Sequence, residues 1–140
     1  MIQGWSGNTT NSPEDTMELG KDFASKIEIG DVISLNGDLA AGKTTFMKGV
    51  LKGIGYEGEV TSPTFTLVNE YESQPKIIHI DCYREKLINR WLDIGIVDYL
   101  NGNNVVFIEW AEYIKSILPE DIISIDIEHL SESKRKIKVL

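Results

Sequence analysis

The sequence lacks several features that whole classes of protein require. Its single cysteine, Cys82, excludes an internal disulfide, which suits a reducing compartment. No stretch approaches the roughly 20 apolar residues of a membrane-spanning helix, and no basic segment followed by an apolar run opens the chain. We therefore expect a soluble, cytoplasmic protein that makes no membrane contact.

Basic residues are also scarce. The chain has 14 Lys and Arg residues against 22 Asp and Glu residues, which gives a formal net charge of −8. A net negative charge repels phosphate backbones, so we expect little direct binding of nucleic acid. Only residues 134–138, Lys-Arg-Lys-Ile-Lys, are locally basic. We interpret them as an edge strand with solvated charges, with a nucleic-acid contact as the less favoured alternative.

The length and composition suit one domain of ordinary size, since 41% of the 140 residues are hydrophobic. A first helix is expected to begin at Ser12-Pro13 and to stop at Gly30. Further helices are expected over residues 43–54 and about 85–100, and strands over residues 32–36, 65–71, 76–80, 105–108, 122–127 and 137–140. No repeat or linker divides them, so we predict one α/β domain, residues 1–140, with a mixed central sheet flanked by helices.

A glycine-rich segment between a predicted strand and a predicted helix fits a phosphate-binding loop. The residues Gly37-Asp38-Leu39-Ala40-Ala41-Gly42-Lys43-Thr44 match the pattern G-x-x-x-x-G-K-[ST]. Its glycines let backbone N–H groups surround a phosphate, and the helix N-terminus adds partial positive charge. Lys43 can reach the outer phosphates, and Thr44 can offer its hydroxyl to magnesium. We predict a P-loop NTPase-like fold; a glycine-rich turn with an incidental lysine is the weaker interpretation.

Two acidic residues end apolar runs, as a P-loop site requires of its metal-holding and water-orienting groups. Glu109 follows residues 105–108, and Asp81 follows residues 76–80. In an open α/β sheet the carboxyl ends of the strands face the ligand crevice, so both acids can converge on the phosphates. We assign metal binding to Glu109 and a catalytic role to Asp81. The alternative for each is an exposed acid in the loop after a strand.

Three other features are close to these acids in the sequence or in kind. We interpret His79 as a packed, hydrogen-bonded histidine rather than a ligand. Trp110, beside Glu109, can support the site or simply fill the core. Residues 61–65, Thr-Ser-Pro-Thr-Phe, can form a loop that senses the third phosphate or a plain turn into the next strand, and the sequence favours neither.

Taken together, these motifs resemble those of the TsaE (formerly YjeE) family, and the resemblance covers nearly the whole chain from Ser12 onward. The motifs stand in family order and spacing: Gly37-Asp38-Leu39-Ala40-Ala41-Gly42-Lys43-Thr44-Thr45-Phe46, Ser62-Pro63-Thr64-Phe65, His79-Ile80-Asp81-Cys82-Tyr83-Arg84 and Glu109-Trp110. The resemblance implies an ATP-binding and ATP-hydrolysing subunit needed for threonylcarbamoyl modification of adenosine 37 (t6A) in tRNAs that read ANN codons.

The resemblance also implies roles for individual residues, with ATP and Mg2+ as cofactors. Thr44 and Glu109 would hold the magnesium, while Lys43 and Asp81 would act in hydrolysis. The residues expected to bind the nucleotide are Thr16, Gly37, Asp38, Leu39, Ala40, Ala41, Gly42, Lys43, Thr44, Thr45 and Trp110. Ala40 stands where the family usually has glycine, a departure that bears on the loop geometry.

The family acts with partners of the TsaD and TsaB types, and the transfer of the threonylcarbamoyl group belongs to the TsaD type. This implies a slow ATPase when the protein is alone, with tRNA engaged through the partners. Two rivals remain. A small-molecule or nucleoside kinase usually has an arginine-bearing lid, whereas this chain has three arginines and no evident lid: Arg84, Arg90 and Arg135. A nucleotide-gated binding module would show no significant turnover.

Overall fold

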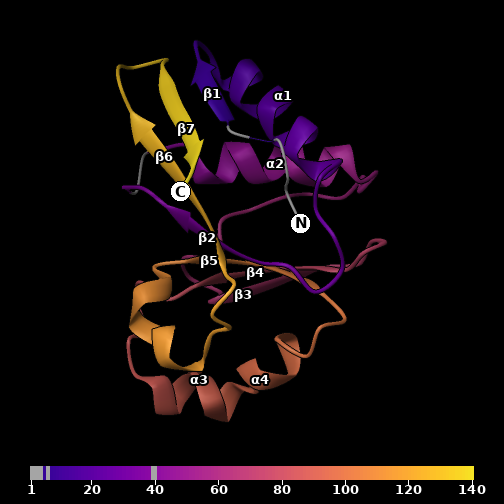
Figure 1. Ribbon diagram of the computed structural model, residues 1–140, viewed down its shortest axis with the longest axis vertical. Helices are drawn as coiled ribbons and strands as arrows, with labels where there is room; N and C mark the ends of the chain where they lie inside the picture. Colours follow the sequence, from indigo (N-terminus) through magenta and orange to yellow (C-terminus); the bar gives the residue numbers. More distant parts are fainter. Residues whose placement is uncertain (1–4, 6, 39–40) are drawn as a thin grey trace.

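The computed structural model, which describes residue 5, residues 7–38 and residues 41–140, contains one seven-stranded sheet with helices on both faces (Figure 1). The strands are β1 (Gly7–Thr10), β2 (Val32–Asn36), β3 (Val68–Tyr71), β4 (Ile77–Asp81), β5 (Val105–Glu109), β6 (Ile123–His129) and β7 (Arg135–Val139). The helices are α1 (Pro13–Ala24), α2 (Lys43–Gly53), α3 (Ile88–Ile94) and α4 (Ile96–Tyr99), together with the 3-10 helix η1 (Ala111–Ile117).

The sheet is mixed, with its parallel strands in the centre. The strand order is β1-β7-β6-β2-β5-β4-β3. Strand β2 pairs in parallel with β5 and β6, and β5 pairs in parallel with β4. The outer strands β3, β7 and β1 pair antiparallel. The carboxyl ends of β2, β4, β5 and β6 therefore lie along one edge, where an α/β sheet binds its ligands.

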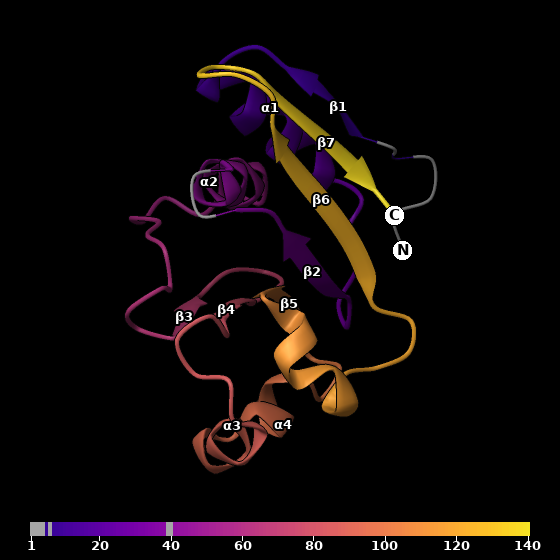
Figure 2. The same cartoon turned by 90° about the vertical axis from the view of Figure 1, so that its left-hand side faces the viewer.

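Helices α1 and α2 cover one face of the sheet, and Figure 2 shows them beside β2, β6 and β7. Their side chains join those of the central strands in one apolar cluster, in which Phe23 and Phe46 are fully buried. The two helices cross at glycines. A Cβ on Gly49 would lie 2.0 Å from the backbone oxygen of Met17, so only glycine permits this close approach.

The other face is covered only over β2, β4 and β5. Helices α3, α4 and η1 pack there around the fully buried Trp91, whose indole Nε1 donates to the backbone oxygen of Glu85 at 2.6 Å. On the same side, Lys136 of β7 and Glu128 of β6 are exposed to solvent. The sheet thus buries both faces at β2, β4 and β5, whereas the face that carries Glu128 and Lys136 is open to solvent at these residues. No helix in the described part of the chain is long and apolar enough to cross a membrane.

The α/β fold with a mixed sheet and flanking helices confirms the prediction from sequence, and β2 has the predicted bounds. The other elements lie within two residues of the predicted bounds, except for three. Helix α1 ends at Ala24, well before Gly30. Strand β3 begins only at Val68, because residues 64–66 form a turn. The helical stretch predicted near residues 85–100 is two short helices, separated by Gly95 in a left-handed conformation with φ of 95°.

Two elements were not predicted, and one was misplaced. Strand β1 and the 3-10 helix η1 have no expected counterpart. The interpretation of the basic segment, residues 134–138, as an edge strand is wrong. The segment lies largely in β7, which pairs with β6 on one side and with β1 on the other. The edge strand on this side of the sheet is β1, which has four residues and pairs with β7.

Candidate functional site

The glycine-rich loop connects the carboxyl end of β2 to the first turn of α2, as predicted. Gly37 has φ of 153°, and a Cβ there would lie 2.5 Å from the backbone oxygen of Ile127. Gly42, with φ of 104°, is the N-cap of α2 and has no side chain to cap it. The first N–H groups of this eleven-residue helix therefore remain available to an anion. The predicted nucleotide-binding residues Leu39 and Ala40 lie outside the described residues.

A cavity of about 270 Å³, which we call the phosphate-loop cavity, opens at the N-terminus of α2. It brings together four separate parts of the chain: the start of α2, the loop at residues 61–65, the end of β5 and the start of β7. The lining residues are Gly42, Lys43, Thr44, Thr45, Ser62, Thr64, Glu109 and Arg135. Of the predicted site residues, the structure thus places Gly42, Lys43, Thr44, Thr45 and Glu109 around one space.

Lys43 is the central cation of this cavity, although only 5% of the residue is exposed. Its Nζ donates to the backbone oxygen of Gly37 at 2.7 Å and lies 3.2 Å from Oε1 of Glu109. The same ammonium lies 5.4 Å from the ring centre of Trp110, within the range of a cation–π contact. The lysine is therefore held over the loop by a carbonyl, a carboxylate and an aromatic face.

Glu109 ends β5 and is buried between two nitrogen groups. Its Oε1 faces Lys43, and its Oε2 lies 2.7 Å from Nε2 of the fully buried His79. Burial raises the pKa of Glu109, but its close contacts with His79 and Lys43 outweigh it. The pKa of Glu109 therefore lies below its ordinary value, and the carboxylate is ionised near neutral pH.

Asp81 ends β4 directly opposite Glu109 in the parallel register. Only 1% of it is exposed. Its Oδ2 accepts the hydroxyl of Thr64 at 3.1 Å, and its Oδ1 accepts the backbone N–H of Tyr83 at 2.8 Å. Asp81 therefore meets the cavity through Thr64, which lines it. Both acids are buried at strand ends, so the alternative of acids exposed in following loops is wrong.

The remaining predicted residues lie around the cavity rather than on its wall. Thr16 is buried in α1, with its hydroxyl oxygen 2.7 Å from that of Thr10, and lines a small cavity of about 40 Å³ together with Gly42 and Thr45. Gly37 and Asp38 line a separate depression of about 500 Å³ along β6 and β7. Ala41 is part of the apolar core.

Arg135 is a site residue that the sequence did not indicate. It was included among the solvated charges of the basic segment, an interpretation that is wrong for this residue. Its Nε donates to the backbone oxygen of Ala41 at 2.8 Å, and its side chain lines the phosphate-loop cavity. The two residues are 94 positions apart, so only the pairing of β7 with β6 brings them together. No local pattern would have revealed it.

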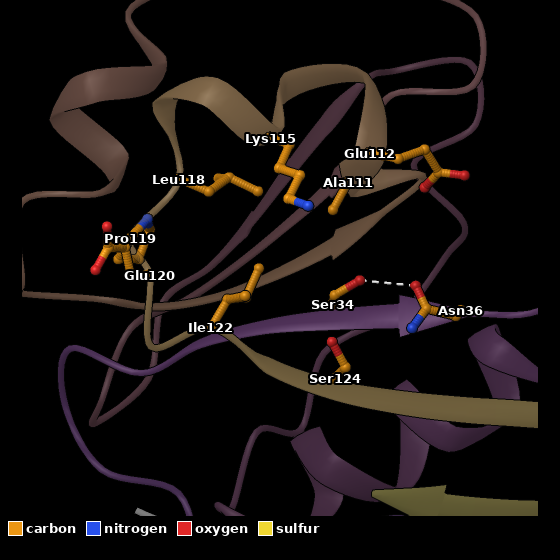
Figure 3. Close-up of a pocket in the computed structure, with 10 residues that line it drawn as sticks. All are labelled: Ser34, Asn36, Ala111, Glu112, Lys115, Leu118, Pro119, Glu120, Ile122 and Ser124. Carbon is orange, nitrogen blue, oxygen red and sulfur yellow. Dashed lines mark hydrogen bonds between the residues drawn. The ribbon is translucent and has the colours of Figure 1, made fainter. Parts of the chain in front are cut away.

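Another cavity, of about 400 Å³, lies on the opposite face of the sheet between η1 and strands β2 and β6. Figure 3 shows Lys115 reaching from η1 toward Ser34, whose hydroxyl donates to Oδ1 of Asn36 at 2.7 Å. None of the described residues predicted to bind the nucleotide lines it. We therefore place the candidate functional site at the N-terminus of α2.

The phosphate-loop cavity suits a nucleotide with magnesium. It combines an uncapped helix N-terminus, a lysine, the Thr44 hydroxyl and the ionised carboxylate of Glu109. Nε1 of Trp110 is buried and has no hydrogen-bond partner among the described residues, so a bound group could accept from it. No cluster of three or more His, Cys, Asp or Glu residues in the described chain could hold a metal ion. Magnesium commonly uses one or two protein ligands with phosphate oxygens and water. The fold and this site are those of the P-loop class of nucleotide-binding proteins.

Comparison with known proteins identifies the family within that class. The sequence pattern of the family described as "Threonylcarbamoyl adenosine biosynthesis protein TsaE" matches residues 10–137. TsaE of Treponema pallidum is 39% identical over 130 residues, which are 93% of this chain and 96% of that protein. TsaE of Aquifex aeolicus is 42% identical over 131 residues, covering 91% of this chain and 90% of that protein. The chain therefore belongs to the TsaE family, which takes part in the t6A modification of tRNA.

A solved structure gives the same result for the fold. The crystal structure of YdiB from Bacillus subtilis matches with a TM-score of 0.79 at 36% identity, covering 94% of this chain and 81% of that chain. The resemblance stated from the sequence motifs is thereby confirmed.

Proposed function

We propose that this chain is a Mg2+-dependent ATPase that acts in t6A formation with partners of the TsaD and TsaB types. The observation that carries the proposal is the pairing of Lys43 with the buried, ionised Glu109 beside the uncapped N-terminus of α2. Membership of the TsaE family supports the pathway. The net charge of −8 supports engagement of tRNA through the partners, because an acidic chain gains little from phosphate contacts.

Lys43 is the group on which nucleotide binding would act first. The ammonium now contacts the backbone oxygen of Gly37 and Oε1 of Glu109. A β- or γ-phosphate at the N-terminus of α2 offers it a more highly charged acceptor. As Lys43 turns to that phosphate, Oε1 of Glu109 becomes free, while His79 continues to hold Oε2.

Thr44 and Glu109 would hold the magnesium, which would neutralise negative charge on the phosphate. When Oε1 is released, the orientation of the Glu109 carboxylate is already fixed by the contact of Oε2 with His79 of β4. The backbone N–H groups at the start of α2 would bind the phosphate oxygens from the opposite side.

Asp81 would act on the water that attacks the γ-phosphate. The reaction breaks the bond between the γ-phosphorus and the ADP oxygen, while a water oxygen bonds to that phosphorus and loses a proton. Asp81 would orient this water or accept the proton with a lone pair that its two donors leave open. Thr64, which lies between Asp81 and the cavity, would position the water with it. Of the two interpretations of residues 61–65, we therefore propose that the loop responds to the third phosphate, and that it does so through Thr64.

The Lys43→Ala variant tests the proposal. Removing the cation should lower the ATPase rate by about 10²–10³-fold, measured with and without TsaD- and TsaB-type partners. The matched control is Lys48→Ala, which changes an exposed lysine on the same helix and should leave the rate unchanged. An unaltered rate in Lys43→Ala would contradict the assignment. Formation of a phosphorylated small molecule in place of free phosphate would identify a kinase instead.

A further inference from the structure

The most exposed large apolar side chain among the described residues is Phe65, which is 81% exposed. Single exposed apolar residues are common and need no explanation. Phe65 is different because Arg84 covers one side of it, with its guanidinium carbon 4.8 Å from the ring centre. Arg84 belongs to a different segment, just after β4, so the contact joins two loops at the carboxyl edge of the sheet.

The contacts of Arg84 and its neighbours extend this pair into a wider surface. Tyr83 is 38% exposed, and the Nζ of Lys86 lies 5.5 Å from its ring centre and 5.0 Å from that of Tyr113. We call the set Phe65, Tyr83, Arg84, Lys86 and Tyr113 the aromatic–cation surface. It alternates aromatic rings with cations. Tyr, Phe and Arg are residue types that are enriched at protein interfaces.

This surface is tied directly to the carboxylate of Asp81. Thr64 donates its hydroxyl to Oδ2, and Tyr83 donates its backbone N–H to Oδ1. The residues that follow these two donors are Phe65 and Arg84, which contact each other. Asp81, its two donors and the exposed pair are thus connected in one closed ring, through these contacts and the chain itself.

Charge indicates the chemistry of the occupant. Residues 83–90, Tyr-Arg-Glu-Lys-Leu-Ile-Asn-Arg, contain three cations and one acid, in a chain whose formal net charge is −8. A partner surface with carboxylates around an apolar pocket complements this: the ring of Phe65 would enter the pocket, and Arg84 would pair with a carboxylate. Unstacked RNA bases can also lie on aromatic rings. The acidic remainder of the chain disfavours them.

We propose that the aromatic–cation surface docks an acidic protein partner, and that docking sets the positions of the two groups that hydrogen-bond to Asp81. The inference rests on the proposed function, because it identifies the surface through which partners would act on that site. It assigns Phe65 and Arg84 to the interface rather than to nucleotide binding, since neither lines the phosphate-loop cavity.

The test uses Phe65→Ala and Arg84→Glu in the full chain, with a purified pair of TsaD- and TsaB-type proteins as the probe. Each variant should weaken binding to the pair about tenfold or more, as expected for an interface anchor. Both should bind ATP within about twofold of the wild type, because they leave the cavity intact. The matched controls are Ile29→Ala, which removes another apolar side chain that is 63% exposed, and Lys48→Glu. Neither control should change binding.

The outcomes separate this inference from the proposed function. If the wild type binds the pair and both variants bind it equally well, the docking surface is wrong and the proposed function stands. If the wild type neither binds the pair nor hydrolyses ATP in its presence, both fail. If Phe65→Ala instead loses affinity for an unmodified tRNA transcript that the wild type binds alone, the occupant is RNA and the proposal is overturned.

Discussion

The two buried carboxylates of the site occupy equivalent positions, yet their surroundings differ. Asp81 and Glu109 face each other in the register of β4 and β5, and each ends its strand. The partners of Glu109 are nitrogen groups that carry or can carry positive charge, Lys43 and His79. The partners of Asp81 are neutral donors, the hydroxyl of Thr64 and the backbone N–H of Tyr83. Two carboxylates at the same level of the sheet are thus prepared for two different tasks.

The different surroundings explain why Glu109 is suited to hold a metal and Asp81 to act on water. Burial raises the pKa of Glu109, but His79 and Lys43 lower it by more, so this group holds a fixed negative charge suited to a cation. A carboxylate held by neutral donors keeps lone pairs for water and has no competing cation. Substitutions that remove only the charge of one acid at a time should therefore give different defects, which the following predictions use.

The largest effect is expected for Asp81→Asn. The amide keeps the shape of the side chain but cannot accept a proton, so the ATPase rate should fall by about 10²–10⁴-fold. The affinity for ATP should stay within a few-fold of the wild type, because Asp81 does not line the cavity. Steady-state phosphate release and equilibrium nucleotide binding measure the two quantities. Asp121→Asn, at an exposed aspartate, is the control. Equal losses in affinity and rate would mean that Asp81 binds the nucleotide.

Glu109→Gln should give the opposite pattern. Loss of the negative charge should raise the Mg2+ concentration needed for half-maximal ATP binding by about 10–100-fold. ATP binding without magnesium should weaken much less, since Lys43 loses a competing partner. Titration with Mg2+ at fixed ATP, followed by the fluorescence of the neighbouring Trp110, checks this. Glu112→Gln, an exposed acid on η1, should leave the Mg2+ requirement unchanged. A variant with the wild-type requirement would exclude Glu109 as a metal-holding group.

Local sequence patterns were sufficient to predict those features of the site that lie within one strand or one loop. The apolar runs before Asp81 and Glu109 and the glycine-rich segment between β2 and α2 are such patterns. The pairing of His79 with Glu109 was not predictable, because it depends on how β4 and β5 are aligned.

Other unpredicted features have the same physical origin. The contact of Arg135 with the loop and the existence of β1 follow from strand pairing at the far side of the sheet. Helix α1 and strand β3 had uncertain ends, because capping and the turn at residues 64–66 decide them.

The smallest effect is expected for His79→Gln, which changes the surroundings of Glu109 without touching either acid. Glutamine cannot carry a positive charge, so the pKa of Glu109 should rise toward its ordinary value. Since its folded-state pKa is lowered, Glu109 stabilises the fold above its unfolded value of about 4.3, and this stabilisation is lost as the pH falls through the folded value. At pH 7 the variant should be less stable by about 1–3 kcal/mol.

Urea unfolding from pH 7 down to pH 3 measures this change, and the difference between His79→Gln and the wild type should shrink below about pH 4. Glu70→Gln is the control at an exposed carboxylate, whose pKa is lowered by hydrogen bonds from Lys76 and Tyr99. Its effect should be small and should vanish in 1 M salt, because solvent and salt screen an exposed pair. If the destabilisation by His79→Gln were the same at every pH, His79 would act through packing alone. The charged surroundings of Glu109 would then be reduced to Lys43, and the contrast with Asp81 would rest on that single cation.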